Sequence, residues 1–208
     1  MNKKSSKLLK RKSIRLKNFD YSSQGLYFIT ICVHNRVCLL GDIINGKMVL
    51  NDAGRMINEL YLKTPRQFKN TTLDEYQIMP NHLHGIIVIT GEMDNPPVGA
   101  TLVVARLDQA GIKPDSRAGI KPAPTENKII TLGNIIGAFK SLTTHKYINC
   151  VKTKNWKPFY KRLWQRNYYE HIIRNENDLN EIREYIKNNP QMWDRDRDNP
   201  AKSGIANK

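Results

Sequence analysis

The sequence predicts a two-layer α+β sandwich built on a mainly antiparallel sheet. First, short runs rich in β-branched and aromatic residues alternate with segments of helical periodicity, roughly in the order β-β-α-β-β-α-β-α. Second, the turns within two pairs of strands are too short for parallel crossovers. Third, 208 residues with 39% hydrophobic content suffice for one sizeable core. We therefore expect a single main domain.

The first part of the chain predicts strands followed by a helix. Residues 27–50 contain three strand-like runs, YFITICV, VCLLGDI and KMVL, separated by polar turns. Asn51 is a good N-cap for a helix that runs to about Phe68, and Pro65 favours an earlier end. The core side of this helix is expected to contain Met56, Ile57 and Leu60.

The middle of the chain predicts a hairpin and then a break in texture. Residues 72–80 and 83–90 indicate two strands separated by Pro80 and Asn81, which favour a turn or bulge. Residues 91–128 instead carry several prolines and a direct repeat of AGIKP. This segment is therefore predicted to be an inserted loop without regular structure.

The last part predicts a helix, a strand or turn, and a second helix. Residues 131–149 carry an apolar stripe at helical spacing, with Lys140 and Lys146 off the stripe. Residues 163–173 fit a strand or a turn. Residues 175–189 predict a helix capped near Asn177. Its apolar side is expected to comprise Leu179, Ile182 and Ile186.

An excess of basic residues is the first functional signal. The 34 Lys and Arg against 19 Asp and Glu give a formal net charge of +15, which attracts polyanions and releases counterions when phosphates are neutralised. Residues 1–20 form a basic arm that either lies along phosphates or only keeps the chain soluble. Residues 21–190 are the main domain, and residues 191–208 are a polar C-terminal tail. Nucleic acid is the expected partner.

Cysteine spacing and hydropathy argue against a disulfide-rich protein, a cysteine zinc protein and a membrane protein. Cys32, Cys38 and Cys150 form no C-x-x-C pair, so neither a disulfide framework nor a cysteine zinc site is indicated. No apolar run of about 18 residues and no secretory signal occurs, and the basic arm has no large apolar face for a membrane surface. We expect a cytoplasmic protein without a membrane partner.

His82 and His84 are the first candidate site residues. They flank Leu83 at the entrance of a predicted strand, and alternate side chains of a strand point to the same face. Both imidazoles can therefore bind one metal ion, while Leu83 points into the core. The alternative for an isolated pair of this kind is chance occurrence on a surface strand.

The stretch MPNHLHGIIVI resembles the histidine-hydrophobic-histidine motif of HUH endonucleases, and among them the REP-associated single-tyrosine transposases. YFITICVHNR, FKSLTTHKY, LWQRNYYEHIIRNENDL and YIKNNP carry the same resemblance in order, over most of the chain outside residues 91–128. The resemblance implies a ferredoxin-like HUH transposase domain over residues 21–190.

The resemblance also implies an activity. Such a protein recognises a hairpin in single-stranded DNA and cleaves beside it, through a tyrosine that leaves a 5′-phosphotyrosine link and a free 3′-hydroxyl. Strand transfer then reverses the step without ATP. A Mg²⁺ or Mn²⁺ ion on the histidine pair is expected to act mainly as a Lewis acid on the scissile phosphate.

Tyr185 is the expected nucleophile, with Tyr168 and Tyr169 as competitors. The latter two lie in YYEHII, where an aromatic pair more often fills a core or stacks on a base. Tyr185 has the alternative of being an amphipathic core residue. Asn189 lies four residues later on the same helical face and is expected as the third metal ligand, in line with the resemblance. Its alternative, a helix C-cap before Pro190, is compatible with that role.

Further residues are expected to contact DNA: Lys140, Lys146, Trp164, Gln165, Arg166 and Arg174. The main alternative function is a domesticated, non-catalytic hairpin-binding protein, against which the presence of both histidines and the tyrosine argues. A replication initiator or relaxase ranks third, because no P-loop region occurs. The sequence leaves open whether the protein is a monomer or a homodimer.

We predict that residues 95–126 can be replaced by a short Gly/Ser bridge without loss of folding or cleavage. A long surface loop adds closure entropy but little buried area. Thermal unfolding and DNA cleavage of the shortened protein test this. An insoluble or inactive product would identify the segment as a structural element.

Overall fold

The computed structural model describes residues 16, 19–90 and 130–202. The predicted insertion at 91–128 lies outside the described residues, as does most of the basic arm. Among the residues that are described, no helix is both long and apolar enough to cross a membrane.

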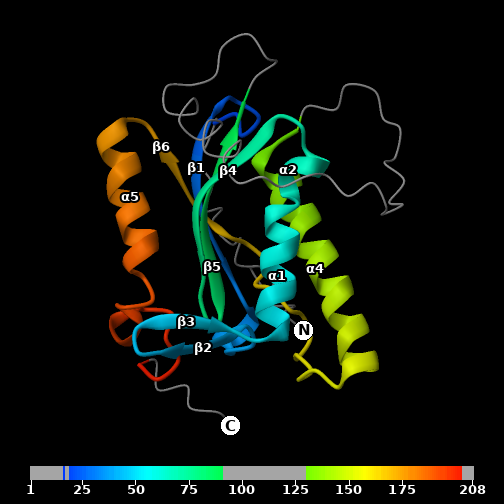
Figure 1. The fold of residues 1–208 in the computed structure, drawn as a ribbon. Helices are drawn as coiled ribbons and strands as arrows, with labels where there is room; N and C mark the ends of the chain where they lie inside the picture. The colour runs from blue at the N-terminus through cyan, green and yellow to red at the C-terminus, as the bar shows by residue number, and fades with distance from the viewer. Residues whose placement is uncertain (1–15, 17–18, 91–129, 203–208) are drawn as a thin grey trace, which may run out of the picture.

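A four-stranded antiparallel sheet forms the centre of the molecule, with strand order β4-β5-β1-β6 (Figure 1). Every neighbouring pair of strands is antiparallel. The strands are β1 (Gly25–Cys32), β4 (Thr71–Ile78), β5 (His82–Ile89) and β6 (Tyr169–Ile173). The chain passes through helices between β1 and β4 and again between β5 and β6, which is the connectivity of a ferredoxin-like sandwich. The predicted α+β fold is confirmed.

Helices α1 (Asp52–Leu62) and α4 (Leu132–Lys154) cover one face of this sheet (Figure 1). The expected core residues of α1 are buried. The first helix ends early, as Pro65 predicted, and the short helix α2 (Thr64–Gln67) follows with that proline in its first turn. Gly85 of β5 lets Tyr61 pack closely, because a Cβ there would lie 2.2 Å from the Tyr61 hydroxyl.

The second and third strands form a separate hairpin and do not extend the central sheet. They are β2 (Gly41–Ile44) and β3 (Lys47–Leu50). Both edges of β1 are already paired, with β5 and β6. The chain therefore turns away after β1 through η1 (His34–Arg36), where Asn35 and Arg36 have positive φ angles of 57° and 55°.

Helix α5 (Glu176–Asn188) lies on the opposite face of the sheet, so the ferredoxin-like sandwich gains a helix on its second side (Figure 1). It packs over a smaller apolar cluster that includes Phe28, Ile86 and Leu179. Its N-cap is Asn175, whose side chain accepts a hydrogen bond from the Asp178 amide. The cap is therefore two residues earlier than the predicted Asn177, because Asn175 has the extended backbone that capping requires.

A bulge in β4 fixes the position of α5. The register of β4 against β5 shifts between Leu73 and Tyr76. Asp74, within the bulge, accepts hydrogen bonds from Nε and Nη2 of Arg183 on α5. The neighbouring Glu75 pairs with Lys187 at 3.3 Å. The Asp74 side chain is only 5% exposed, so the Arg183 pair is shielded from water.

We predict that Arg183→Leu destabilises the protein by about 2–3 kcal/mol, because it leaves the buried Asp74 carboxylate without its partner. Urea unfolding measures this. The double variant Asp74→Leu/Arg183→Leu should be more stable than the single one, since no uncompensated charge remains. Equal loss in both variants would contradict the role assigned to the ion pair.

Candidate active site

His82 and His84 lie at the start of β5 on the face that α5 covers. Their side chains are almost fully buried, at 0% and 3% exposure. Leu83 between them points to the other face and is part of the main core, as the alternation predicted. Thr30 of β1 is directly opposite His84 in the sheet register.

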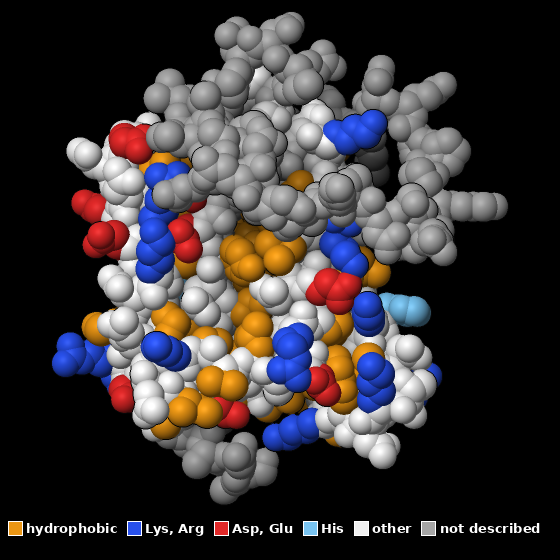
Figure 2. All heavy atoms as spheres, in the orientation of Figure 1, with side chains coloured by type: hydrophobic (Ala, Val, Ile, Leu, Met, Phe, Trp, Pro, Cys, Tyr) orange, Lys and Arg blue, Asp and Glu red, His pale blue; other side chains and the backbone are white. Residues whose placement is uncertain are grey.

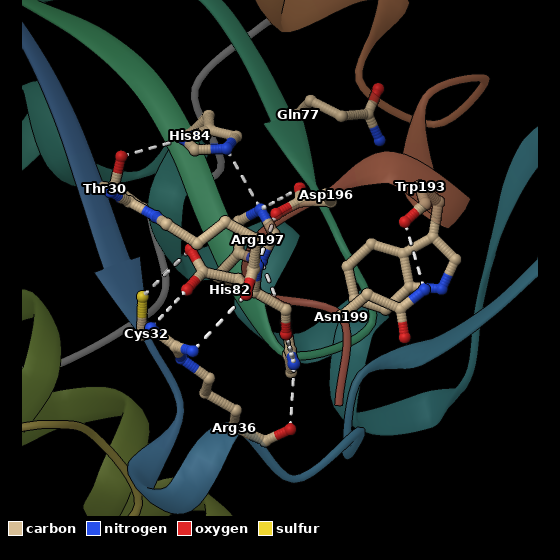
Figure 3. A network of polar contacts seen from close by, with 12 residues as sticks. Thr30, Cys32, Arg36, Gln77, His82, His84, Trp193, Asp196, Arg197 and Asn199 are labelled. Carbon is tan, nitrogen blue, oxygen red and sulfur yellow. Dashed lines mark hydrogen bonds and ion pairs between the residues drawn. The ribbon is translucent and has the colours of Figure 1, made fainter. Parts of the chain in front are cut away.

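His82 lies in a network of polar contacts (Figure 3), and the hydrogen bonds of Asn81 determine which nitrogen of His82 carries a proton. The Asn81 side-chain NH₂ donates to the carbonyls of Arg36 and Asp198, both at 2.8 Å. The Asn81 oxygen therefore faces His82 Nδ1, at 2.8 Å, and can only accept. His82 Nδ1 must be protonated, so His82 Nε2 presents a lone pair.

The two imidazoles face each other through their Nε2 atoms, which are 3.0 Å apart. Thr30 Oγ1 lies 2.9 Å from His84 Nδ1 and can donate or accept. If Thr30 accepts, both Nε2 atoms present lone pairs, and only a cation makes that arrangement favourable. If Thr30 donates, His84 Nε2–H bonds to His82. The two histidines can therefore either bind a cation or form a hydrogen bond to each other.

One carboxylate approaches the histidines, and the side chain of Asn189 lines the same cavity as His84. Asp196 Oδ2 lies 3.8 Å from His82 Nε2, and ligand atoms of His82, His84 and Asp196 lie within 4.8 Å of one another. Both Asp196 Oδ2 and Asn189 Oδ1 are buried without a hydrogen-bond partner in the described structure. Buried oxygens of this kind carry a desolvation cost that a bound cation would offset, so the residues fit a divalent metal ion.

Asp196 is a site residue that the sequence analysis missed. The residues after Pro190 were assigned to a polar tail, but those described, up to residue 202, pack beside the histidines around the short helix η2 (Trp193–Arg195). Asp198 is buried there and pairs with Arg36 at 2.9 Å. The alternating acids of WDRDRD were the available signal, but the segment has no apolar periodicity that would have placed it against the sheet.

Tyr185 projects from α5 to the histidine pair. Its hydroxyl lies 3.4 Å from His84 Nε2, and the side chain is 50% exposed. Both residues line a cavity of about 330 Å³ together with Asn189, Met192 and Asp196. Burial, followed by the nearby Asp196 charge, raises the pKa of Tyr185, while a hydrogen bond from Asn189 lowers it. Asn189 is also the C-cap of α5, so the structure fits both readings of this residue.

The competing tyrosines lie at the start of β6 and directly before it. Tyr168 is 7% exposed and belongs to the main core. Tyr169 is 50% exposed on β6, and its ring packs edge-on against Phe28. Of the three, Tyr185 is the one with a described contact to a histidine of the pair.

The expected DNA-contacting residues are not gathered around the histidines. Trp164 is 4% exposed and donates from Nε1 to Thr143, so its ring lies in the core and away from the surface that DNA can reach. Lys140 donates to the carbonyls of Gln165 and Asn167, which fixes the chain before β6. The exposed members of the set are Lys146, Arg166 and Arg174.

The chain is 41% identical over 189 residues to a Haemophilus influenzae protein described as uncharacterized, covering 89% of this chain and 91% of that protein. The chain belongs to the family of this Haemophilus influenzae protein. No family model matches the chain.

Two solved structures are similar in shape. One is a REP-associated tyrosine transposase bound to a REP hairpin, with a TM-score of 0.49 and 18% identity, over 93% of this chain and 76% of that one. The other is a candidate transposase from Deinococcus radiodurans R1, with a TM-score of 0.40 and 13% identity, over 84% and 95% of the two chains. At such identities, the chemistry of the site has to be argued from the residues of this chain.

Burial keeps both histidines neutral, which is the form that binds metals. Loss of hydration lowers the pKa of His84 well below its ordinary value of 6.5, and the neighbouring His82 lowers it further. Burial also lowers the pKa of His82, and the carboxylates of Asp196 and Asp198 oppose that shift. The histidine pair is therefore ready to bind a cation without first losing protons.

We predict that the metal-free protein loses stability as the pH falls below about 6.5, the ordinary histidine pKa. Below that pH the histidines of the unfolded chain bind protons, whereas the buried imidazoles of the folded state, whose pKa values are lower, stay neutral. Acid therefore favours unfolding. Urea unfolding in EDTA at several pH values measures the slope. His84→Gln should flatten it between pH 6.5 and the lowered pKa, and an unchanged slope would contradict the neutral state of His84.

Proposed function

We propose that the protein is a metal-dependent DNA nuclease and strand transferase that acts beside a hairpin in single-stranded DNA, in the manner of a REP-associated tyrosine transposase. One observation carries the proposal. Tyr185, whose hydroxyl is a possible nucleophile, lines the same cavity as Asp196 and the buried His84, which faces His82 at 3.0 Å. The resemblance of the sequence motifs supplies the hairpin as substrate.

His82, His84 and Asp196 would hold the ion, with Asn189 as a further oxygen donor. Two imidazoles with carboxylate and amide oxygens suit Mn²⁺ or Mg²⁺. A bound ion would polarise the scissile phosphate and stabilise the charge that develops on it.

Tyr185 would form the covalent intermediate. Its oxygen forms a bond to the phosphorus, the bond from phosphorus to the 3′-oxygen breaks, and the products are a 5′-phosphotyrosine link and a 3′-hydroxyl. The phenol is protonated at rest because its pKa is raised, so the proton must leave as the bond forms. Asp196, whose charge acts on Tyr185 and which lines the same cavity, is a candidate acceptor. One phosphodiester replaces another, so the reverse reaction joins a new strand without ATP.

A long stretch without acidic residues supports a polyanionic substrate. Residues 127–169 contain no Asp or Glu, and the described part of this stretch, from residue 130, comprises α4 and the chain that leads into β6. Figure 2 shows Lys and Arg side chains over α1, α4 and α5 on one side of the molecule. The exposed basic residues of the acid-free stretch include Lys146, Lys152, Lys154, Lys157, Lys161, Arg162 and Arg166. A surface of this composition neutralises phosphates and releases counterions.

This basic stretch is joined directly to the active site. Leu163 accepts a hydrogen bond from the His34 amide at 2.8 Å, and the Gln165 amide donates to the Cys32 carbonyl at 2.9 Å. Cys32 is directly opposite His82 in the sheet. DNA bound by the basic residues would therefore pass close to the histidines. A non-catalytic hairpin-binding protein would have no need for the buried histidine and carboxylate cluster.

We predict that Asp196→Asn weakens Mn²⁺ binding by about 10- to 100-fold. The substitution keeps the shape but removes the charge that faces the histidines. Calorimetric titration with Mn²⁺ measures the affinity. The matched control is Asp194→Asn, which removes the same charge from an exposed position two residues away and should bind normally. Similar affinities in the two variants would exclude Asp196 as a ligand.

We predict that Tyr185→Phe folds and binds hairpin DNA but forms no covalent adduct, a loss of about a thousandfold or more. The substitution removes only the attacking oxygen. The assay uses labelled single-stranded hairpin DNA with Mn²⁺, followed by denaturing electrophoresis. Tyr168→Phe and Tyr169→Phe are the controls and should still form the adduct. An adduct that persists in Tyr185→Phe and disappears in a control would move the nucleophile to that tyrosine.

A further inference from the structure

Tyr169 is an exposed aromatic residue that the proposed chemistry does not use. Its side chain is 50% exposed, on a strand at the edge of the sheet. Burial of a large aromatic ring is energetically favourable. A half-exposed ring beside the proposed active site is therefore well suited to bind a ligand with an aromatic face.

The sheet register places Tyr169 on the same face as the metal site. Tyr169 of β6 is opposite Thr30 of β1, and Thr30 is opposite His84 of β5. Directly opposed residues of an antiparallel sheet point to the same side. Two strand spacings of about 4.8 Å place the Tyr169 backbone about 10 Å from that of His84.

Phe28 connects Tyr169 with the nucleophile. The Tyr169 and Tyr185 rings both pack edge-on against Phe28, at centroid distances of 6.2 and 6.0 Å. Phe28 is itself stacked on His84, at 5.5 Å. The buried Phe28 ring therefore supports the exposed Tyr169 ring from one side and fixes its position relative to the histidines.

We propose that Tyr169, supported by Phe28, is a binding subsite for one unpaired nucleobase next to the scissile phosphate. The inference rests on the proposed function, because it takes the phosphate to lie at the His82 and His84 site. Bases stack on aromatic rings whatever their identity, so the subsite positions the strand without reading its sequence. An anchored base limits the motion of the adjoining phosphate and holds it in line with Tyr185.

The binding test compares two DNA hairpins, one with single-stranded flanks and one without. All proteins carry Tyr185→Phe, so that no covalent adduct disturbs the equilibrium. Adding Tyr169→Val, which removes the ring but keeps strand propensity, should raise Kd for the flanked hairpin by about 5- to 100-fold. Kd for the flankless hairpin should not change. Tyr169→Phe is the matched control and should bind both hairpins normally.

A spectroscopic test reports stacking directly. The fluorescent base 2-aminopurine, placed in turn at each unpaired position of the flanks, should change its emission on binding at one position. The change should be lost with Tyr169→Val and kept with Tyr169→Phe. Thermal unfolding of each variant confirms that the fold is intact.

Two results would overturn the subsite. One is an unchanged Kd for the flanked hairpin in Tyr169→Val. The other is an equal rise in Kd for both hairpins, which would place the contact on the paired stem. Failure of the proposed function would look different, because the protein with Tyr185 intact would then form no adduct with Mn²⁺ and flanked hairpin, whatever residue stands at 169.

Discussion

The side chain of Asn81 is the connection on which the arrangement of the candidate site depends. It is fully buried, and its amide donates to the backbone of Arg36, after β1, and to that of Asp198, near the C-terminus. Its oxygen accepts from His82 and fixes the protonated nitrogen of that ring. One amide group thus brings together three parts of the chain and orients the His82 imidazole. An aspartate in its place could not donate either backbone bond.

The second constraint is the clamp between β4 and α5. The helix that carries Tyr185 buries few apolar residues, chiefly Leu179 and Ile186, against the sheet. So few apolar contacts only weakly determine the position of α5 along the sheet. The hydrogen-bonded ion pair of Arg183 and Asp74 is directional and determines that position more strongly. The position of Tyr185 relative to the histidines therefore depends on polar contacts, while the main core on the other face supplies most of the burial.

Local periodicity is what the sequence could reveal, and contacts between distant segments are what it could not. The period of two placed His82 and His84 together and Leu83 in the core, and helical spacing placed Tyr185 near Asn189. The sequence could not reveal Asp196, because its segment is held beside the histidines by a long-range contact. The hydrogen bond from Asn81 to the Asp198 carbonyl joins residues 117 positions apart. The burial of Trp164 was not predicted for a similar reason, since its hydrogen-bond partner Thr143 lies on α4, 21 residues earlier.

The ion pair between Asp74 of β4 and Arg183 of α5 limits which substitutions the protein tolerates at these two positions. Asp74 occupies a bulge, so its reach toward α5 depends on both its side-chain length and the extra residue in β4. A substitution at residue 74 or 183 alone leaves the other charged side chain without its partner. A paired substitution to apolar residues, or an exchange of the acid and the base between the two positions, leaves no unpaired charge. These two positions should therefore covary during evolution, and the length of β4 should be kept even where the residues of α5 that face solvent diverge.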